Sequence, residues 1–123
     1  MKYEDAIKTS FDILNLAKNV NIENNIIKQI DIQYNARFYN VCNLIIIFFN
    51  CTGGSDYAAI KNCGYMVKAL IKLLGYEHEE CLYLSSVHDK PCRIIVKDGM
   101  CIGVGHFMLN KFILFDDLVK IDE

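Results

Sequence analysis

The chain has 123 residues, of which 53% are hydrophobic and 23% are charged, and its formal net charge is −2. This length suits one domain with a buried core, and the high apolar fraction with little net charge excludes an intrinsically disordered chain. Thirteen basic residues face fifteen acidic ones without forming a basic run, which argues against binding of a nucleic-acid polymer. The most apolar stretch, Val41–Phe49, is interrupted at Asn43 and is too short to cross a bilayer. The acidic residues near the N-terminus are unlike a signal peptide, so we expect a cytoplasmic protein with no membrane partner.

Six cysteines are many for a chain of this length, and they stand at positions 42, 51, 63, 81, 92 and 101. None belongs to a Cys-x-x-Cys pair, the spacing typical of structural zinc sites, so no bound metal is expected. Without an export signal disulfides are disfavoured, and we expect buried free thiols that behave as small apolar side chains.

The first half of the chain contains one helical pattern and two strand patterns. Apolar residues recur every three or four positions over 3–18, which predicts an amphipathic helix that packs on its own sheet or serves as an oligomerisation arm. Residues 20–25 are expected to form a polar connector. Polar and apolar residues alternate over 29–34, as in a strand with one solvated face, and a turn is expected over 35–40. The apolar run 44–49 predicts a central strand covered on both faces.

The next segments alternate between turn and helix signals. The sequence Thr-Gly-Gly-Ser at 52–55 is expected to form a turn between the buried strand and a helix. Apolar residues at helical spacing over 62–74, followed by Gly75, predict that helix and its end. The acidic stretch 77–80 is expected to be exposed, and 82–87 to form a weak strand or a turn.

The clearest local signal is a β-hairpin over Cys92–Phe107. Asp98 and Gly99 suit a two-residue turn, which requires positive φ angles at both positions. The register that follows pairs Lys97 with Met100, Ile95 with Ile102, and Arg93 with Val104.

Together these elements predict an α+β fold. We expect a single domain over 1–123, with an N-terminal helix in 1–19 and an α+β core in 26–123. The core would be an antiparallel sheet of about four strands with two helices packed on it. Gly103 and Gly105 fall on one face of the hairpin, where they would let a helix or another backbone approach closely.

Arg93 is the candidate binding residue that the hairpin register singles out. On the predicted register it shares a largely apolar sheet face with His106, and an unpaired guanidinium there would be costly. It therefore needs an anion. A carboxylate such as Asp116 or Asp117 and the phosphate of a ligand both remain open as that anion.

A Cys/His hydrolase is one alternative. Cys51 or Cys63 precedes His106 in the chain, and Asn110 and Asp116 follow as possible orienting groups, an order like that of papain-like enzymes. The neighbourhood Cys-Gly-x-Cys-Trp of those enzymes is absent.

From about residue 26 to the end, the order of features resembles a group of small phage-encoded proteins. In that group two strands lead to a glycine-rich turn, a helix closed by glycine, a strand of Gly-Lys-x-x-Arg-Val type, a Gly-His strand and an acidic terminal segment. The matching residues are Gly53 and Gly54, Gly64 to Gly75, Lys90-Pro91-Cys92-Arg93-Ile94, and Gly105-His106 before Asp116 and Asp117. The chain lacks the group's Gly-Phe-Gly-Gly element, and Phe112–Phe115 replaces its tryptophan-containing segment.

At the level of class, the chain is similar to phage anti-defence proteins that act as sponges for nucleotide signals of bacterial TIR-domain immunity, such as Thoeris anti-defence and Sequestin-like proteins. That similarity implies a viral protein of the host bacterial cytoplasm that sequesters a cyclic ADP-ribose-type nucleotide without turnover, and so has neither catalytic residues nor a cofactor.

A site for such a nucleotide follows from the same similarity. Arg93 and His106 would hold phosphate, Tyr57 or Tyr65 would stack on the base, and a homo-oligomer would close the pocket. Independently of the similarity, the segment Thr52-Gly53-Gly54-Ser55 lies between a predicted strand and a helix, where its backbone N–H groups could bind phosphate; a plain turn is the alternative. A third class, an inhibitor that binds a host defence protein directly, also remains open.

Overall fold

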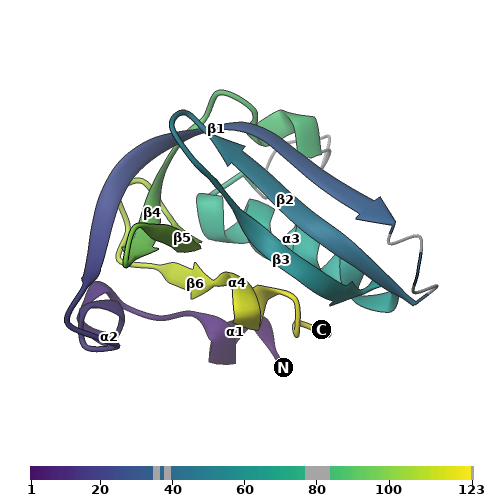
Figure 1. Cartoon of the computed structure of the whole chain (residues 1–123), viewed down its shortest axis with the longest axis horizontal. Helices are drawn as coiled ribbons and strands as arrows, with labels where there is room; N and C mark the ends of the chain where they lie inside the picture. Colours follow the sequence, from purple (N-terminus) through teal and green to yellow (C-terminus); the bar gives the residue numbers. More distant parts are fainter. Residues whose placement is uncertain (35–36, 38–39, 77–83, 123) are drawn as a thin grey trace.

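A computed structural model of the chain describes residues 1–34, 37, 40–76 and 84–122 (Figure 1). The predicted α+β class is confirmed, and the antiparallel sheet has six strands rather than about four. The strands are β1 (Val20–Tyr34), β2 (Val41–Phe48), β3 (Thr52–Ala59), β4 (Pro91–Lys97), β5 (Met100–Gly105) and β6 (Phe112–Leu114). The α-helices are α1 (Tyr3–Ala6), α2 (Ser10–Leu14), α3 (Cys63–Leu74) and α4 (Phe115–Leu118), and two 3-10 helices span Ile60–Asn62 and Leu84–Val87.

The long strand β1 joins the two halves of the sheet, whose strand order is β3-β2-β1-β4-β5-β6. Its first half pairs with β4, from Val20 opposite Lys97 to Ile26 opposite Pro91. Its second half pairs with β2 from Ile27 onward, and Figure 1 shows β1 arching over the molecule between the two partners. The polar connector expected over 20–25 is therefore wrong. Its polar residues stand in a strand whose backbone pairs with β4.

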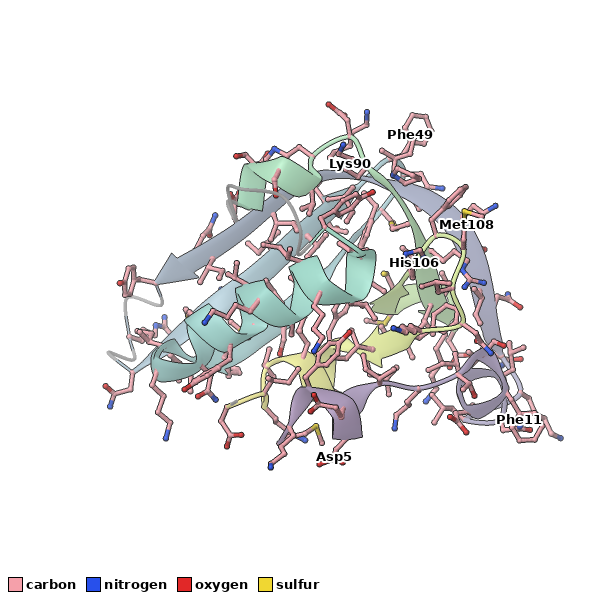
Figure 2. All side chains as sticks on the ribbon, turned by 180° about the vertical axis from the view of Figure 1, so that it is seen from behind. Asp5, Phe11, Phe49, Lys90, His106 and Met108 are labelled. Atoms are coloured by element: carbon pink, nitrogen blue, oxygen red, sulfur yellow. The ribbon has the colours of Figure 1, made fainter. Side chains whose placement is uncertain are left out.

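The helix α3 supplies one side of the core. It confirms the helix predicted over 62–74 to within one residue, and Gly75 ends it in the left-handed conformation at φ 88°. The helix lies along one face of the sheet (Figure 2). Its buried residues are Met66, Ala69, Leu70, Ile71, Leu73 and Leu74. They form clusters with buried side chains of the strands, among them Ile27, Leu44, Ile46, Phe48, Ile94 and Val104.

Only one face of β2 is fully covered. Along this strand every second residue, such as Leu44 and Ile46, is buried, while the residues between them are half-buried. The prediction of a strand buried on both faces is wrong, since α3 packs on one face only.

The N-terminal segment does not form the single helix predicted over 3–18. Lys8, between α1 and α2, pairs with Phe112 of β6 through hydrogen bonds of 2.8 and 2.9 Å, which requires extended backbone. After Lys8 a second helix, α2, begins. At its start the Thr9 hydroxyl accepts a hydrogen bond from the Asp12 N–H at 3.3 Å, and the Asp12 carboxylate accepts one from the Thr9 N–H at 3.1 Å. This reciprocal capping box favours a new helix start at that point.

The turn expected at 52–55 is also wrong, because these residues begin β3. Gly54 lies opposite Ile45 of β2, and Gly53 lies opposite Ile46. By contrast, the expected close approach to Gly103 is confirmed, since a Cβ atom there would lie 2.6 Å from the carbonyl oxygen of Ile113 in β6.

Three predicted segments fall wholly or partly outside the described residues, one of them 82–87, of which only 84–87 are described. The other two are the acidic stretch 77–80 and the turn at 35–40, of which only residues 37 and 40 are described. Within 82–87 the described residues form a 3-10 helix rather than a strand. No helix in the described ranges is long and apolar enough to cross a membrane.

Candidate functional site

The β4–β5 hairpin has the predicted turn but a different register. Asp98 and Gly99 have φ angles of 51° and 80°, and Lys97 faces Met100 as expected. An irregularity next to Ile95 then shifts the pairing by one residue.

The shift changes the cross-strand partners of the residues farther from the turn than the irregularity. Ile95 lies opposite Gly103, and Arg93 lies opposite Gly105, whereas Ile102 and Val104 were expected. A β-bulge inserts one extra residue on one strand, so side chains beyond it face differently from those in a regular hairpin.

Arg93 is held by uncharged groups rather than by an anion. Its Nε donates to the carbonyl oxygen of His106 at 2.8 Å, and its Nη2 donates to the carbonyl oxygen of Leu109 at 2.6 Å. The guanidinium carbon lies 4.5 Å from the centroid of the Phe112 ring, a cation–π contact. Neither Asp116 nor Asp117 pairs with Arg93, so the alternative of a carboxylate partner is wrong. The other expected anion, a ligand phosphate, stays a prediction.

The His106 side chain makes hydrogen bonds within the loop that connects β5 and β6. Its Nδ1 accepts the backbone N–H groups of Met108 and Leu109, each at 2.9 Å. A proton on Nδ1 would break both bonds, so this nitrogen does not serve as the second phosphate donor that was expected. Arg93 contacts the backbone of His106, and the contacts of the two residues fix the loop between β5 and β6, where Figure 2 labels His106.

The other predicted site residues lie in two further places. Thr52, Gly53, Gly54 and Ser55 pair with β2 as a strand, and Tyr57 of the same strand is 65% exposed. Tyr65 stands on the outer side of α3 and is 40% exposed. The eight predicted residues therefore do not form one site.

The structure brings together a different set, which we name the lysine–tyrosine groove. It has a volume of about 470 Å³ and is lined by Lys2, Tyr3, Glu4, Tyr65, Lys68, Ala69 and Lys72. Lys72 Nζ lies 4.7 Å from the centroid of the Tyr3 ring and 4.0 Å from Glu4 Oε1. Among the described residues, this lining between α1 and α3 carries three lysine side chains and one carboxylate.

The residues that α3 contributes to this groove can be identified from their spacing in the sequence. Tyr65, Lys68, Ala69 and Lys72 follow the spacing i, i+3, i+4, i+7, which places them on one face of α3. The other half depends on α1 turning back against α3, which the prediction of one continuous N-terminal helix excluded.

The described cysteine thiols contact one another rather than a histidine. The Sγ atoms of Cys42 and Cys63 lie 3.3 Å apart, and Cys51 and Cys101 are close enough for each to affect the pKa of the other. A Cys/His pair for hydrolysis is therefore not assembled at Cys51 or Cys63. Asn110, one expected orienting group, accepts the backbone N–H of Ser10 at 2.6 Å instead.

In the described ranges, no three residues among His, Cys, Asp and Glu are placed to hold a metal ion.

Burial determines which thiols react. It raises the pKa of Cys42 to about 11 and the pKa values of Cys92 and Cys101 to about 12, so these groups stay protonated at pH 8. Among the five described cysteines we expect iodoacetamide to alkylate Cys63 first and Cys92 last, as followed by peptide mass mapping. In unfolded protein, where thiols ionise near pH 8.5, all should react alike. Equal labelling rates in folded protein would contradict this assignment.

The same raised pKa values predict alkaline unfolding. The unfolded chain releases thiol protons at a lower pH than the folded chain does, so the stabilisation from Cys92 and Cys101 is fully present below about pH 8.5. It should be lost progressively as the pH rises toward 12.

An exposed apolar patch lies at the end of the molecule where the β5–β6 loop emerges. Its members Ile26, Phe49, Pro91 and Phe107 line a depression of about 370 Å³. Phe49 is 72% exposed, and Met108 on the neighbouring loop is 79% exposed (Figure 2). The expected homo-oligomer stays a prediction, and this patch is the surface on which we would first test it.

No protein-family model, curated protein or solved structure matches the chain.

Proposed function

We propose that the protein binds a nucleotide-type anion in the lysine–tyrosine groove and holds it without chemical turnover. The observation that carries this proposal is the convergence of Lys2, Lys68 and Lys72 with the rings of Tyr3 and Tyr65 around one groove. Its volume of about 470 Å³ falls in the range usual for small-molecule sites.

The two kinds of lining side chain suit the two parts of a nucleotide. Lysine ammonium groups donate to phosphate oxygens, and Lys68 is exposed with no carboxylate of the described residues within ion-pair distance. Tyrosine rings offer a flat surface on which a base can stack. The one carboxylate among the described lining residues is that of Glu4, whose Oε1 lies 4.0 Å from Lys72 Nζ.

The lining also supports binding rather than turnover. Among the described residues that line it there is no cysteine, histidine, serine or threonine, side chains that often act as nucleophile or proton shuttle. In the setting that the resemblance implies, the bound molecule would be a cyclic ADP-ribose-type immune signal, withdrawn from its host receptor by slow release.

The proposal is tested by equilibrium dialysis against ADP-ribose, cyclic ADP-ribose, AMP and inorganic phosphate, with the retained ligand analysed after heat denaturation. We expect a nucleotide to be retained and recovered unchanged. Retention of none of these ligands, or recovery of a hydrolysed product, would contradict sequestration.

Lys68→Gln is expected to weaken the binding of the retained nucleotide about tenfold or more, because a hydrogen bond between an ammonium group and phosphate is lost. Isothermal titration calorimetry measures the change. Lys97→Gln is the matched control, since it removes the same charge at an exposed position of β4 outside the groove. If both variants weaken binding equally, overall charge rather than the groove is responsible.

A second candidate, direct inhibition of a host protein, is favoured by the apolar patch at Phe49 and Phe107. Phe49→Ser separates the two candidates. It should leave nucleotide retention unchanged if the groove carries the function, and it should abolish inhibition if the patch does.

A further inference from the structure

Two free thiols meet at the junction of β2 and α3. Cys42 and Cys63 both carry free thiols, and their Sγ atoms lie 3.3 Å apart. A disulfide bond is about 2.05 Å long, so small side-chain rotations would close the remaining gap. The two residues come from different elements, a strand and the first turn of a helix, and are 21 positions apart in the sequence.

The environments of the two thiols differ in a way that suits consecutive steps. Cys63 is half-buried and is the first residue of α3. Cys42 is buried, and its thiol also donates to the carbonyl oxygen of Ala58 at 3.5 Å. The more accessible thiol, that of Cys63, is therefore the first to attack, and the buried Cys42 thiol lies beside it for the second step.

We propose that Cys42 and Cys63 form a reversible dithiol–disulfide pair that responds to low-molecular-weight disulfides such as oxidised glutathione. The Cys63 thiolate attacks one glutathione sulfur, forming a mixed disulfide and releasing the other half as a thiolate, which takes up the proton that Cys63 lost. Cys42 then attacks the Cys63 sulfur, and its proton leaves with the second reduced glutathione. The two protein thiols are oxidised, and one glutathione disulfide is reduced to two thiols.

The expected consequence is a cross-link between β2 and the start of α3. It would enclose β3 and the 3-10 helix Ile60–Asn62 in a covalent loop. Because such a loop restricts the unfolded chain, the oxidised protein should melt about 5–10 °C higher than the reduced protein. A reducing cytoplasm would keep the pair open, so the bond would form only under oxidising stress.

Peptide mapping of the full chain after incubation with oxidised glutathione tests the pair. Trypsin yields peptide 38–61, which contains Cys42 and Cys51, and peptide 62–68, which contains Cys63. In the Cys51→Ser variant, a covalent link between these peptides must come from Cys42 and Cys63. We expect that link, together with the loss of two hydrogens from the intact protein and reversal by dithiothreitol.

Cys63→Ser is the matched variant, and it should abolish both the link and the rise in melting temperature. Cys51→Ser should retain both. Glutathione that stays attached to Cys63, a link through Cys81 instead, or an unchanged melting temperature after complete linkage would overturn the proposal. None of these results depends on nucleotide binding, so this inference and the proposed function fail separately.

Discussion

Gly54→Ala is expected to lower the free energy of unfolding by about 4 kcal/mol or to prevent folding altogether. Gly54 has a φ of 141°, a conformation that L side chains rarely adopt. A Cβ atom there would also clash with the backbone carbonyl oxygen of Leu44 in the neighbouring strand. That oxygen belongs to the ladder in which Gly54 faces Ile45, so relief of the clash would break strand pairing.

Gly64→Ala is the matched control for this substitution. Gly64 lies exposed in the first turn of α3, and a Cβ atom there would meet no atom within 4 Å. Alanine should stabilise the helix by about 0.5–1 kcal/mol, so the same chemical change acts with opposite sign. Chemical denaturation measures both variants. Gly54→Ala with wild-type stability would contradict the strand assignment of Thr52–Ala59.

Arg93→Ala is expected to lower the free energy of unfolding by about 3 kcal/mol, since two charged hydrogen bonds and a cation–π contact are lost. The carbonyl groups of His106 and Leu109 would lose the donors that Arg93 supplies, and the loop between β5 and β6 would lose one of its supports. Faster amide exchange at Met108 and Leu109 should accompany the lower melting temperature.

Arg93→Lys keeps the charge but not the two-pronged donor geometry, so it should recover only part of the stability. This pair of variants also tests the phosphate-clamp role that the resemblance implied. A stable Arg93→Ala protein that has lost nucleotide binding would support the clamp and contradict the structural role.

The parts of the fold that the sequence predicted correctly depend on local signals. The apolar period of α3 and its closing Gly75 lie within one segment, and so do Asp98 and Gly99 at the hairpin turn. The first half of β1 carried no such signal. Its polar residues resemble a connector, and it becomes a strand only because β4, far along the chain, pairs with it.

The candidate site was harder to predict for a related reason. Charge reasoning about Arg93 considered side-chain and ligand anions, whereas the partners are backbone carbonyls that no residue pattern reveals. The bulge beside Ile95, which changed the register, left no trace in the sequence either. The spacing of Tyr65, Lys68, Ala69 and Lys72 marks one side of the groove in the sequence, but the short helix α1 that completes it carries no such signal.

The single strand that joins the two halves of the sheet has a kinetic consequence. The ladder between β1 and β4 connects residues about seventy positions apart, from Val20 with Lys97 to Ile26 with Pro91. The hairpins β1–β2 and β4–β5 close far shorter loops and lose less chain entropy on forming. We therefore expect both hairpins to form early and the joining ladder to limit the folding rate, so that a small domain folds slowly for its length.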